Sequence, residues 1–592
     1  MFLRRVGANK NRTGGVYWAL VESHRTAQGP RHRTVTYLGE LSPSKRAGWA
    51  ELQRALDRSP EKEMRLFSDD PPESSVPEHV EVNVRGVRVE RVWDFGDVYI
   101  GWRLWQALGL DEFLDARIGR GREDVSWSMV AAILALARFC EPNSETHIAD
   151  TWYRRTALDD LIGVDAELVN KDRLYRGLDA ILPHKEAIES HLRERFVTMF
   201  DADYDLILYD VTSTYFEGEA EANPQAQRGH SRDKRSDCKQ VCIALCVTRE
   251  GLPIAYDVFP GNRNDVKTLE DIVNGVERRH GKANRVWVVD RGIASEANLA
   301  FLRARGLRYV VGTPKSGLRR FEAELLDSGW TEVRPGVEVK KCAGANEEET
   351  FVLCRSGDRR EKEKAMHERF TERIEKALVK LEGRLEKARR RVERAAVDRQ
   401  IGRLLGRNQR GAGAFKIVVE EDANRDGGLR VKWTRDEKWT AWAALTEGHY
   451  LLRTNMNEWA PEDLWKTYVQ LTQAESAFRT QKSELEIRPI WHHGEKRVQA
   501  HILFSFLAYA MWKTLEMRMS RTELGNGPRT LLEEAKKIKV SDVILPTTSG
   551  RALRLRCVSE PDAAQRALFD RLGVEIPKRL GEPRWTTAVA KM

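Results

Sequence analysis

The chain contains the run Leu206-Ile-Leu-Tyr-Asp-Val-Thr212, in which Asp210 stands among apolar and β-branched residues. A short apolar run of this kind predicts a strand that is buried on both faces. A carboxylate inside such a strand is costly unless a metal ion or a cation compensates its charge. Asp210 is therefore a candidate ligand of a cation, and a structural hydrogen-bond acceptor is the alternative role for it.

The residues after this run predict a mixed α/β sheet. In chain order they indicate strands over 240–247 and 253–259, a helix over Asp265–Arg279 with Asp265 as its N-cap, a strand over 285–290, a helix from Ser295 and a strand over 307–312. Connections of hairpin length make the first three strands antiparallel, and the fourth strand can then lie beside the first. Asp210 and Asp290 would meet at one edge of the sheet, where paired carboxylates favour a hard cation such as Mg²⁺ or Mn²⁺.

A third carboxylate, Glu475, lies on a helix predicted over 464–482. One stripe of that helix carries, at steps of three and four residues, Leu464, Tyr468, Leu471, Glu475, Phe478 and Lys482. Because most of the stripe is apolar, we expect it to face the core, so that Glu475 points inward rather than to water. Lys482 lies two turns further on, about 10 Å along the axis, and can face the same groove. The alternative is an amphipathic helix with one buried salt bridge.

Residues 314–449 interrupt the α/β pattern, which resumes over 450–517 with an apolar helix from Val498 to Met517. The short strands expected in this part of the chain lie near 333–339, 351–354, 415–419 and 450–453. Between them a long charged helix carries a heptad-like seam formed by Ile374, Leu378, Leu381, Leu385, Ala388, Val392 and Ala395. The seam fits either packing of the helix on its own domain or a contact between two copies of the chain.

The regions outside this pattern differ from it in charge. The chain of 592 residues is too long for one compact core, and its net charge of +9 is unevenly placed. The first fifty residues carry nine Lys and Arg against two Glu, and they predict strands over 16–22 and 33–39. We therefore expect a basic β-rich module over 1–80, which either binds a polyanion or acts as a structural cap. The predicted organisation also includes a Pro-containing linker after this module and a helical region over 90–200. At the other end of the chain we expect a basic tail over 518–592.

The composition excludes several other classes of protein. The seven Cys are odd in number and form no Cys-x-x-Cys pair, so neither a disulfide framework nor a zinc ribbon is indicated. Cys238, Cys242 and Cys246 fall near a predicted strand and suit small buried thiols. The adjacent His492 and His493 point in different directions on either a helix or a strand, which disfavours a zinc site. No apolar run approaches the ~20 residues of a membrane span, so we expect a cytoplasmic protein without a membrane partner.

Three motifs resemble those of the DDE transposases of bacterial insertion sequences, specifically the group with a β-strand-rich insertion before the last catalytic helix. The signature of that group is Tyr, two residues, Arg, three residues, Glu, six residues, Lys. The chain matches it with Tyr468, Glu475 and Lys482 but has Leu471 at the position of the Arg, for which Arg479 is the candidate substitute. The other two matching motifs are Tyr209-Asp-Val-Thr-Ser-Thr214 and Val289-Asp-Arg-Gly292. The polar loop Gly229-His-Ser-Arg-Asp233 resembles this group as well.

The resemblance implies a ribonuclease H-like catalytic core formed by residues 201–313 and 450–517. It implies that Asp210, Asp290 and Glu475 are both the catalytic residues and the ligands of two Mg²⁺ or Mn²⁺ ions, which promote in-line attack at phosphorus. The reaction would be nicking at the ends of the element and transfer of the 3′-ends into target DNA, that is, cut-and-paste transposition.

The resemblance also implies the partners of the chain. These are target DNA and the terminal inverted repeats of the element, which the module over 1–80 would recognise. A homodimer is expected in the DNA complex because two ends must be joined, and the protein would be associated with the nucleoid. Tyr468, Lys482, Arg479 and Arg291 are the expected contacts to DNA, positioning it without reading its sequence. Relatives close a hairpin by flipping a base onto an aromatic ring, and the candidates here, with core packing as the alternative, are Trp330, Trp433, Trp439 and Trp442.

Two other functions remain open. A metal-dependent nuclease that cuts without strand transfer would share the three carboxylates but would not need the insertion. An inactive copy that binds DNA and represses transposition would need none of them, and the substitution at Leu471 leaves room for it.

Overall fold

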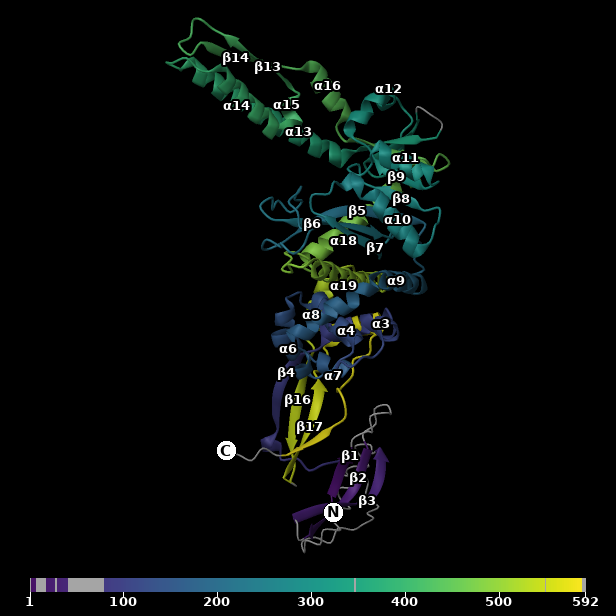
Figure 1. Cartoon of the computed structure of the whole chain (residues 1–592). Coiled ribbons are helices and arrows are strands. Elements are labelled where there is room, and N and C mark those ends of the chain that lie inside the picture. The colour runs from purple at the N-terminus through teal and green to yellow at the C-terminus, as the bar shows by residue number, and fades with distance from the viewer. Residues whose placement is uncertain are drawn as a thin grey trace. The chain divides into compact units, whose positions relative to one another are not determined.

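The computed structural model describes residues 2–6, 17–26, 29–40, 79–344, 348–548 and 550–587 (Figure 1). The chain forms two compact units. The larger unit comprises residues 89–543 and 556–582, and the smaller unit comprises residues 1–88, 544–555 and 583–592. All of the predicted catalytic residues belong to the larger unit.

In the smaller unit, three strands form an antiparallel sheet in the order β1-β2-β3. These are β1 (Phe2–Val6), β2 (Tyr17–Thr26) and β3 (Gly29–Glu40). The strands predicted over 16–22 and 33–39 correspond to β2 and β3, whereas β1 was not predicted. The predicted linker with Pro71, Pro72 and Pro77 lies outside the described residues.

The larger unit is built on a nine-stranded mixed sheet with the order β10-β11-β12-β15-β9-β8-β5-β6-β7. Its strands are β5 (Leu206–Tyr215), β6 (Gln240–Val247), β7 (Pro253–Pro260), β8 (Val286–Val289), β9 (Arg308–Gly312), β10 (Thr331–Arg334), β11 (Val337–Ala343), β12 (Thr350–Ser356) and β15 (His449–Thr454). As predicted, β5, β6 and β7 are antiparallel neighbours, and β8 lies parallel beside β5. Cys242 and Cys246 are buried on β6, whereas Cys238 precedes that strand.

The helices between these strands differ from the prediction in one detail. Residues 265–279 do not form a single helix capped by Asp265. Instead a 3₁₀ turn (Asp265–Lys267) is capped by Asn264, whose side chain accepts a hydrogen bond from the Val266 N–H at 3.0 Å, and α10 (Leu269–His280) follows. The predicted helix start at Ser295 is correct, because the Ser295 hydroxyl caps α11 (Glu296–Ala304).

The segment predicted as a separate insertion over 314–449 is in part an extension of the core sheet. Strands β10, β11 and β12 pair with one another, and β12 pairs with β15, which pairs with β9. The rest of the segment has a hydrophobic cluster of its own. It is formed by α13 (Gly357–Glu386), α14 (Arg394–Arg407), β13 (Phe415–Glu421) and β14 (Leu429–Arg435). The segment 314–449 also contains the short helices α12 (Glu322–Leu326), α15 (Gln409–Ala412) and α16 (Glu437–Thr446).

The predicted heptad seam packs within this cluster. Ile374, Leu378, Leu381 and Leu385 are buried against residues of α14, β13 and β14. The helix ends at Glu386, so Ala388, Val392 and Ala395 do not continue the seam on it. Of the two interpretations, packing of the helix on its own domain is the one that accounts for these buried side chains.

The helical region shares one hydrophobic core with the sheet. Its main helices are α2 (Gly96–Ala107), α3 (Leu110–Ile118), α4 (Trp127–Cys140), α8 (Lys171–Ile181) and α9 (Lys185–Phe200), with shorter turns α5 (Glu145–His147), α6 (Tyr153–Arg155) and α7 (Leu158–Ile162) between them. The long apolar helix α19 (Glu495–Arg521) contacts α4 and α8 as well as β7 and α18 (Thr472–Ser483) (Figure 1). A helix that is apolar on all sides must be covered on all sides, and α19 is covered by these two layers.

Residues 518–592 are not the simple basic tail that the sequence predicted. They contain α20 (Pro528–Ala535), β16 (Lys539–Pro546), β17 (Arg551–Val558), α21 (Ala563–Leu572) and β18 (Arg584–Thr587). In the smaller unit, β17 pairs with β18 in antiparallel fashion. In the larger unit, β16 lies beside β4 (Arg88–Asp94). This pairing joins segments more than 400 residues apart, which no local pattern predicts. Among the described residues, no helix combines the length and apolar character needed to cross a membrane.

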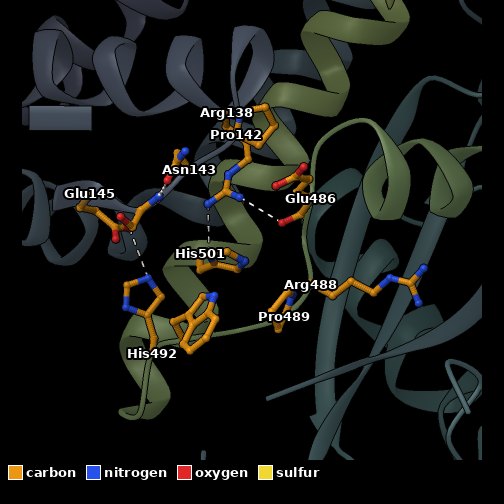
Figure 2. Close-up of a pocket in the computed structure, with 11 residues that line it drawn as sticks. Arg138, Pro142, Asn143, Glu145, Glu486, Arg488, Pro489, His492 and His501 are labelled. Atoms are coloured by element: carbon orange, nitrogen blue, oxygen red, sulfur yellow. Dashed lines mark hydrogen bonds and ion pairs between the residues drawn. The ribbon is translucent and has the colours of Figure 1, made fainter. Parts of the chain in front are cut away.

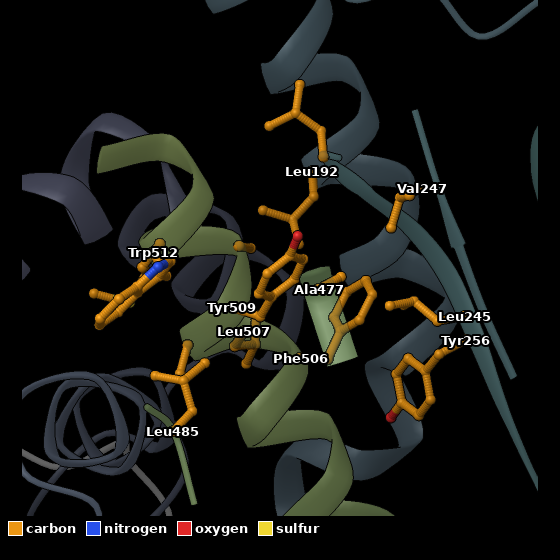
Figure 3. Close-up of a cluster of buried hydrophobic side chains, with 14 of the residues drawn as sticks. Leu192, Leu245, Val247, Tyr256, Ala477, Leu485, Phe506, Leu507, Tyr509 and Trp512 are labelled. Carbon is orange, nitrogen blue, oxygen red and sulfur yellow. The ribbon is translucent and has the colours of Figure 1, made fainter. Parts of the chain in front are cut away.

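Replacing Phe506 by Ala tests the role of α19. Phe506 is 2% exposed and its ring centroid lies 4.9 Å from that of Tyr256 on β7 (Figure 3). The Phe506→Ala protein should lose about 3–5 kcal/mol in free energy of unfolding, measured by chemical denaturation, because it creates a cavity between the helical layer and the sheet. Val379→Ala on α13, where the side chain is 56% exposed, is the control and should change it by no more than about 0.5 kcal/mol.

Candidate active site

Asp210 and Asp290 stand at corresponding positions of two neighbouring parallel strands. The register of β5 and β8 pairs Tyr209 with Val289, and each aspartate is the next residue of its strand or of the segment that follows it. Asp210 is half-buried between Tyr209 and Val211, which are both fully buried. The predicted approach of the two aspartates at one edge of the sheet is therefore correct.

Glu475 joins the same cavity, but its surroundings differ from the prediction. The helix expected over 464–482 is two helices, α17 (Pro461–Val469) and α18, which meet at Gln470 and Leu471. Because α18 starts anew at Thr472, Leu471, Ala474 and Phe478 form its buried face while Glu475 is exposed instead of pointing into the core. Glu475 lies in the first turn of α18, where the helix dipole favours a negative charge.

A cavity of about 380 Å³ brings the three carboxylates together. Its charged lining consists of Asp210, Asp265, Asp290, Glu475, Arg232, Arg479 and Lys482. The four carboxylates outnumber the three cations, so the cavity carries a formal charge of −1 before anything binds. A negatively charged cavity of this kind favours cations and resists the approach of a phosphate.

The electrostatics of Asp210 reflect its position. The pKa of Asp210 is raised to about 6, chiefly by burial and also by the charges of Asp290 and Glu475, whereas the Val211 N–H and Arg232 oppose the shift. The Val211 N–H donates to Asp210 Oδ1 at 2.8 Å. Arg232 gives limited compensation, because its guanidinium is bonded to Asp265. Asp210 is thus a carboxylate whose charge lacks an adequate partner.

The candidate ligands are of the chemical type that a divalent metal ion prefers, but they are not close enough together to coordinate one. All three candidate ligands are carboxylates, the donors that Mg²⁺ and Mn²⁺ prefer. In the described part of the chain, however, no three His, Cys, Asp or Glu side chains are close enough together to hold an ion. Glu475, which is exposed on the first turn of α18, would have to move toward the two strand-borne aspartates to complete a ligand set.

Tyr468, the first residue of the matched signature, packs beside Asp290. Its hydroxyl donates a long hydrogen bond of 3.5 Å to Asp290 Oδ1, and burial raises the pKa of Tyr468. The close approach of the ring requires Gly312 at the end of β9, because a Cβ there would collide with the Tyr468 hydroxyl. Arg291 and Arg479 are both exposed, and of these two Arg479 lines the cavity.

Lys482 is held by a residue whose role the sequence did not indicate. Its Nζ lies 2.9 Å from Asp233 Oδ1, and the guanidinium of Arg488 is bonded to the same oxygen. The Asp233 side chain is only 5% exposed and the Lys482 side chain 13%. Burial lowers the pKa of Lys482, and Asp233 opposes that shift. Asp233 belongs to the matched loop 229–233, but its pairing with positions 249 and 255 residues away had no signal in the sequence.

The candidate tryptophans and histidines lie in other surroundings. Trp433 and Trp439 pack against the cluster of α13, α14, β13 and β14, and Trp330 and Trp442 pack against a smaller cluster that includes residues of β11, β12 and β15. All four side chains are half-buried, which accords with packing. His492 forms an ion pair of 3.2 Å with Glu145.

Comparison with known proteins places the chain in a family. The chain belongs to the transposase DDE domain family, whose sequence profile matches residues 201–511, and the N-terminal domain of IS1634 family transposases matches residues 3–70. It is thus a DDE transposase of the kind found in bacterial insertion sequences, an enzyme of metal-dependent DNA cleavage and phosphoryl transfer. No curated protein matches the chain.

Two solved structures resemble the chain weakly. A cryo-EM structure of the piggyBac transposase synaptic complex with hairpin DNA shares 10% identity over 74% of this chain and 79% of that one, with a TM-score of 0.35. The Mos1 transposase paired-end complex with the left transposon end shares 11% identity over 32% of this chain and 60% of that one, with a TM-score of 0.14. Neither likeness is close enough to assign residues or contacts.

The uncompensated charge of Asp210 predicts that Asp210→Asn stabilises the metal-free protein. Because the folded pKa is raised, the folded state binds more protons than the unfolded state between about pH 4 and pH 6, and this group's contribution to stability falls as the pH rises through that window. Near pH 7.5 in EDTA the variant should gain on the order of 1–3 kcal/mol, and by about pH 4 most of this gain should be lost. Thermal unfolding at both pH values measures it, with the exposed Asp463→Asn as control.

The shared ion pair predicts the opposite effect at Asp233. Asp233→Asn leaves the cations of Lys482 and Arg488 without a counter-charge in a largely buried site, and it should lower the free energy of unfolding by about 3 kcal/mol. Asp237→Asn is a matched control on the same loop, because Asp237 is 67% exposed and paired with Arg235 at the surface. The control should leave the unfolding midpoint unchanged, and equal midpoints for the two variants would contradict the assigned role of Asp233.

Proposed function

We propose that the protein excises an insertion sequence and inserts it elsewhere, by nicking the DNA at the ends of the element and transferring the 3′-ends into target DNA. The observation that carries the proposal is the placement of Asp210 and Asp290 at adjoining ends of parallel strands, with Glu475 in the same cavity. These three residues are the proposed catalytic carboxylates and metal ligands.

The topology around the aspartates supports a ribonuclease H-like core. Three antiparallel strands, β5, β6 and β7, are followed by β8 and β9, which lie on the other side of β5 and run parallel to it. In such a sheet, residues at the carboxyl ends of the central parallel strands face one crevice, where ligands bind. The catalytic core would comprise residues 201–313 and 450–517, with β10–β12 extending its sheet.

The proposed cofactor is a pair of Mg²⁺ or Mn²⁺ ions held by Asp210, Asp290 and Glu475. When bound, two such ions supply activation of the attacking hydroxyl and stabilisation of the leaving oxygen in an in-line displacement at phosphorus. The chain's contribution is to hold the carboxylates at rigid strand ends and to keep the formal charge of the cavity negative until cations enter. A phosphate approaching the metal-free cavity would meet net repulsion.

The cations at the cavity are the proposed contacts for the DNA backbone. Arg479 is four residues after Glu475 on α18, so the two side chains share one face of the helix. This places Arg479 in the cavity, whereas Leu471 is buried and 6% exposed. Arg479 therefore takes the role of the arginine that the signature has at position 471. Lys482, Tyr468 and the exposed Arg291 complete the proposed set.

The proposed partners are DNA molecules and a second copy of the chain. The N-terminal residues matched by the IS1634 profile would recognise the terminal inverted repeats, since their basic charge suits a phosphate backbone. A homodimer would form in the DNA complex, because two ends must be joined to one target. The protein would act in the cytoplasm, on the nucleoid.

Cleavage of a labelled duplex that carries the element's own terminal repeat tests this function. With Mg²⁺ or Mn²⁺ the parent should cut at the repeat boundary and give joined products, and Asp210→Ala or Glu475→Ala should lower the rate about a thousand-fold or more. Asp463→Asn on α17 is the matched control and should cut at the parental rate, because its side chain is exposed and outside the cavity.

The other outcomes of this assay separate the competing functions. Metal-dependent cutting without joined products would indicate a nuclease, and specific binding without cutting would indicate a DNA-binding repressor. Cutting that survives both Ala substitutions would show that the three carboxylates are not the catalytic residues.

A further inference from the structure

A second cavity of about 430 Å³ lies in the larger unit, between the helical layer and the segment that follows α18. The end of α4 and the residues after it provide Arg138, Pro142 and Glu145, the segment 486–492 provides most of the opposite wall, and His501 on α19 is also part of the lining. Figure 2 shows the polar groups of these separate segments converging on the cavity. Neither the matched motifs nor the three carboxylates account for it.

The inner walls of this cavity are fixed by their own hydrogen bonds. Arg138 donates to the Glu486 carbonyl at 3.1 Å and lies 3.3 Å from His501 Nδ1, while Glu145 pairs with His492 at 3.2 Å (Figure 2). Glu145 and His501 are each 6% exposed. A cavity whose polar lining is already paired is preformed, and ordering it costs a ligand little.

Trp491 is the unusual residue of the lining. Its side chain is 66% exposed, and it is the one aromatic residue among the strongly exposed large apolar side chains of the described chain. Within the described residues no other aromatic ring and no cation stacks on its indole. Pro142 and Pro489 add apolar surface to the same cavity. A free indole beside a polar, preformed hollow is suited to stacking on a planar heterocycle such as a nucleobase.

The cavity is connected to the catalytic cavity by one ion cluster. Arg488 belongs to the lining of the Trp491 cavity, and Lys482 belongs to the lining of the catalytic cavity. Both cations are bonded to the same oxygen of Asp233. Two cations sharing one carboxylate leave a net positive charge between the cavities, and this charge suits the phosphate that links successive nucleotides of a strand.

We propose that the Trp491 cavity is a subsite for unpaired nucleotides of the DNA strand that leaves the catalytic cavity. One base would stack on the Trp491 indole, and the adjoining phosphate would contact Arg488. The inference rests on the proposed function, since it takes the ligand to be DNA, and it adds a preference for single-stranded DNA that the three carboxylates do not imply. The alternative partner for an exposed indole is another protein surface, including a second copy of the chain.

Equilibrium binding with Ca²⁺ in place of Mg²⁺ tests the subsite, because Ca²⁺ offsets the negative charge of the carboxylate-lined cavity. The probes are a blunt duplex of about 20 base pairs and the same duplex ending in about six unpaired thymidines, on either strand. Trp491→Ala should bind the tailed duplex about 5- to 100-fold more weakly than the parent and the blunt duplex equally well, because a stacking contact is lost. Trp491→Phe should restore most of the affinity, since a smaller aromatic ring still stacks.

Leu326→Ala is the control, because Leu326 is 72% exposed on α12 and lies outside both cavities. Equal binding of the tailed duplex by Trp491→Ala and parent would overturn the proposal, and so would an equal loss on both duplexes. A change in self-association by sedimentation, with DNA binding intact, would assign the indole to a protein contact instead. If the parent cleaves its terminal repeat, these results concern the subsite alone, whereas a parent that neither binds these duplexes nor cleaves its terminal repeat would refute the proposed function itself.

Discussion

The charge of Asp210 at the junction of two buried strands is the constraint on which the site depends. Tyr209 and Val211 on either side of it are fully buried, so the strand cannot shift to expose the carboxylate without losing apolar packing on both faces. Burial and the neighbouring carboxylates together raise the pKa of Asp210 to about 6. This unfavourable electrostatic energy lowers the free energy of unfolding of the metal-free protein. A cation that binds beside Asp210 removes it, so cation binding also stabilises the fold.

The helix α19 gives the site a rigid base. It packs on α4 and α8 of the helical layer and on β7 and α18 of the catalytic layer, and it is buried along most of its length. Glu475 and Lys482 lie on α18, and α4 leads into the wall of the Trp491 cavity. Because α19 packs on both of these helices, it fixes the position of one cavity relative to the other. This explains why residues 90–200, which lack every catalytic motif, share the core of the sheet instead of forming a separate domain.

The sequence predicts those parts of the fold that depend on local pattern. The apolar run around Asp210, the hairpin-length connections and the strand ending at Asp290 were enough to place two of the three carboxylates. The break between α17 and α18 was not predictable, because the three- and four-residue spacing continues across Leu471 while the backbone starts a new helix. The pairing of β12 with β15 was also not predictable, since the sequence of neither strand indicates a partner about 100 residues away.

Glu475 and Asp233 show why the remainder of the site needed the structure. The periodicity around Glu475 indicated a buried position, yet its place in the first turn of α18 leaves it exposed at the cavity. Asp233 has no periodicity at all, and its role comes from two cations that reach it from distant parts of the chain. In the proposed function, the two aspartates and Glu475 would hold the metal ions, and the two cations bonded to Asp233 would contact phosphate. Leu471 fits this division, because Arg479 on the same face as Glu475 supplies the positive charge that position 471 lacks.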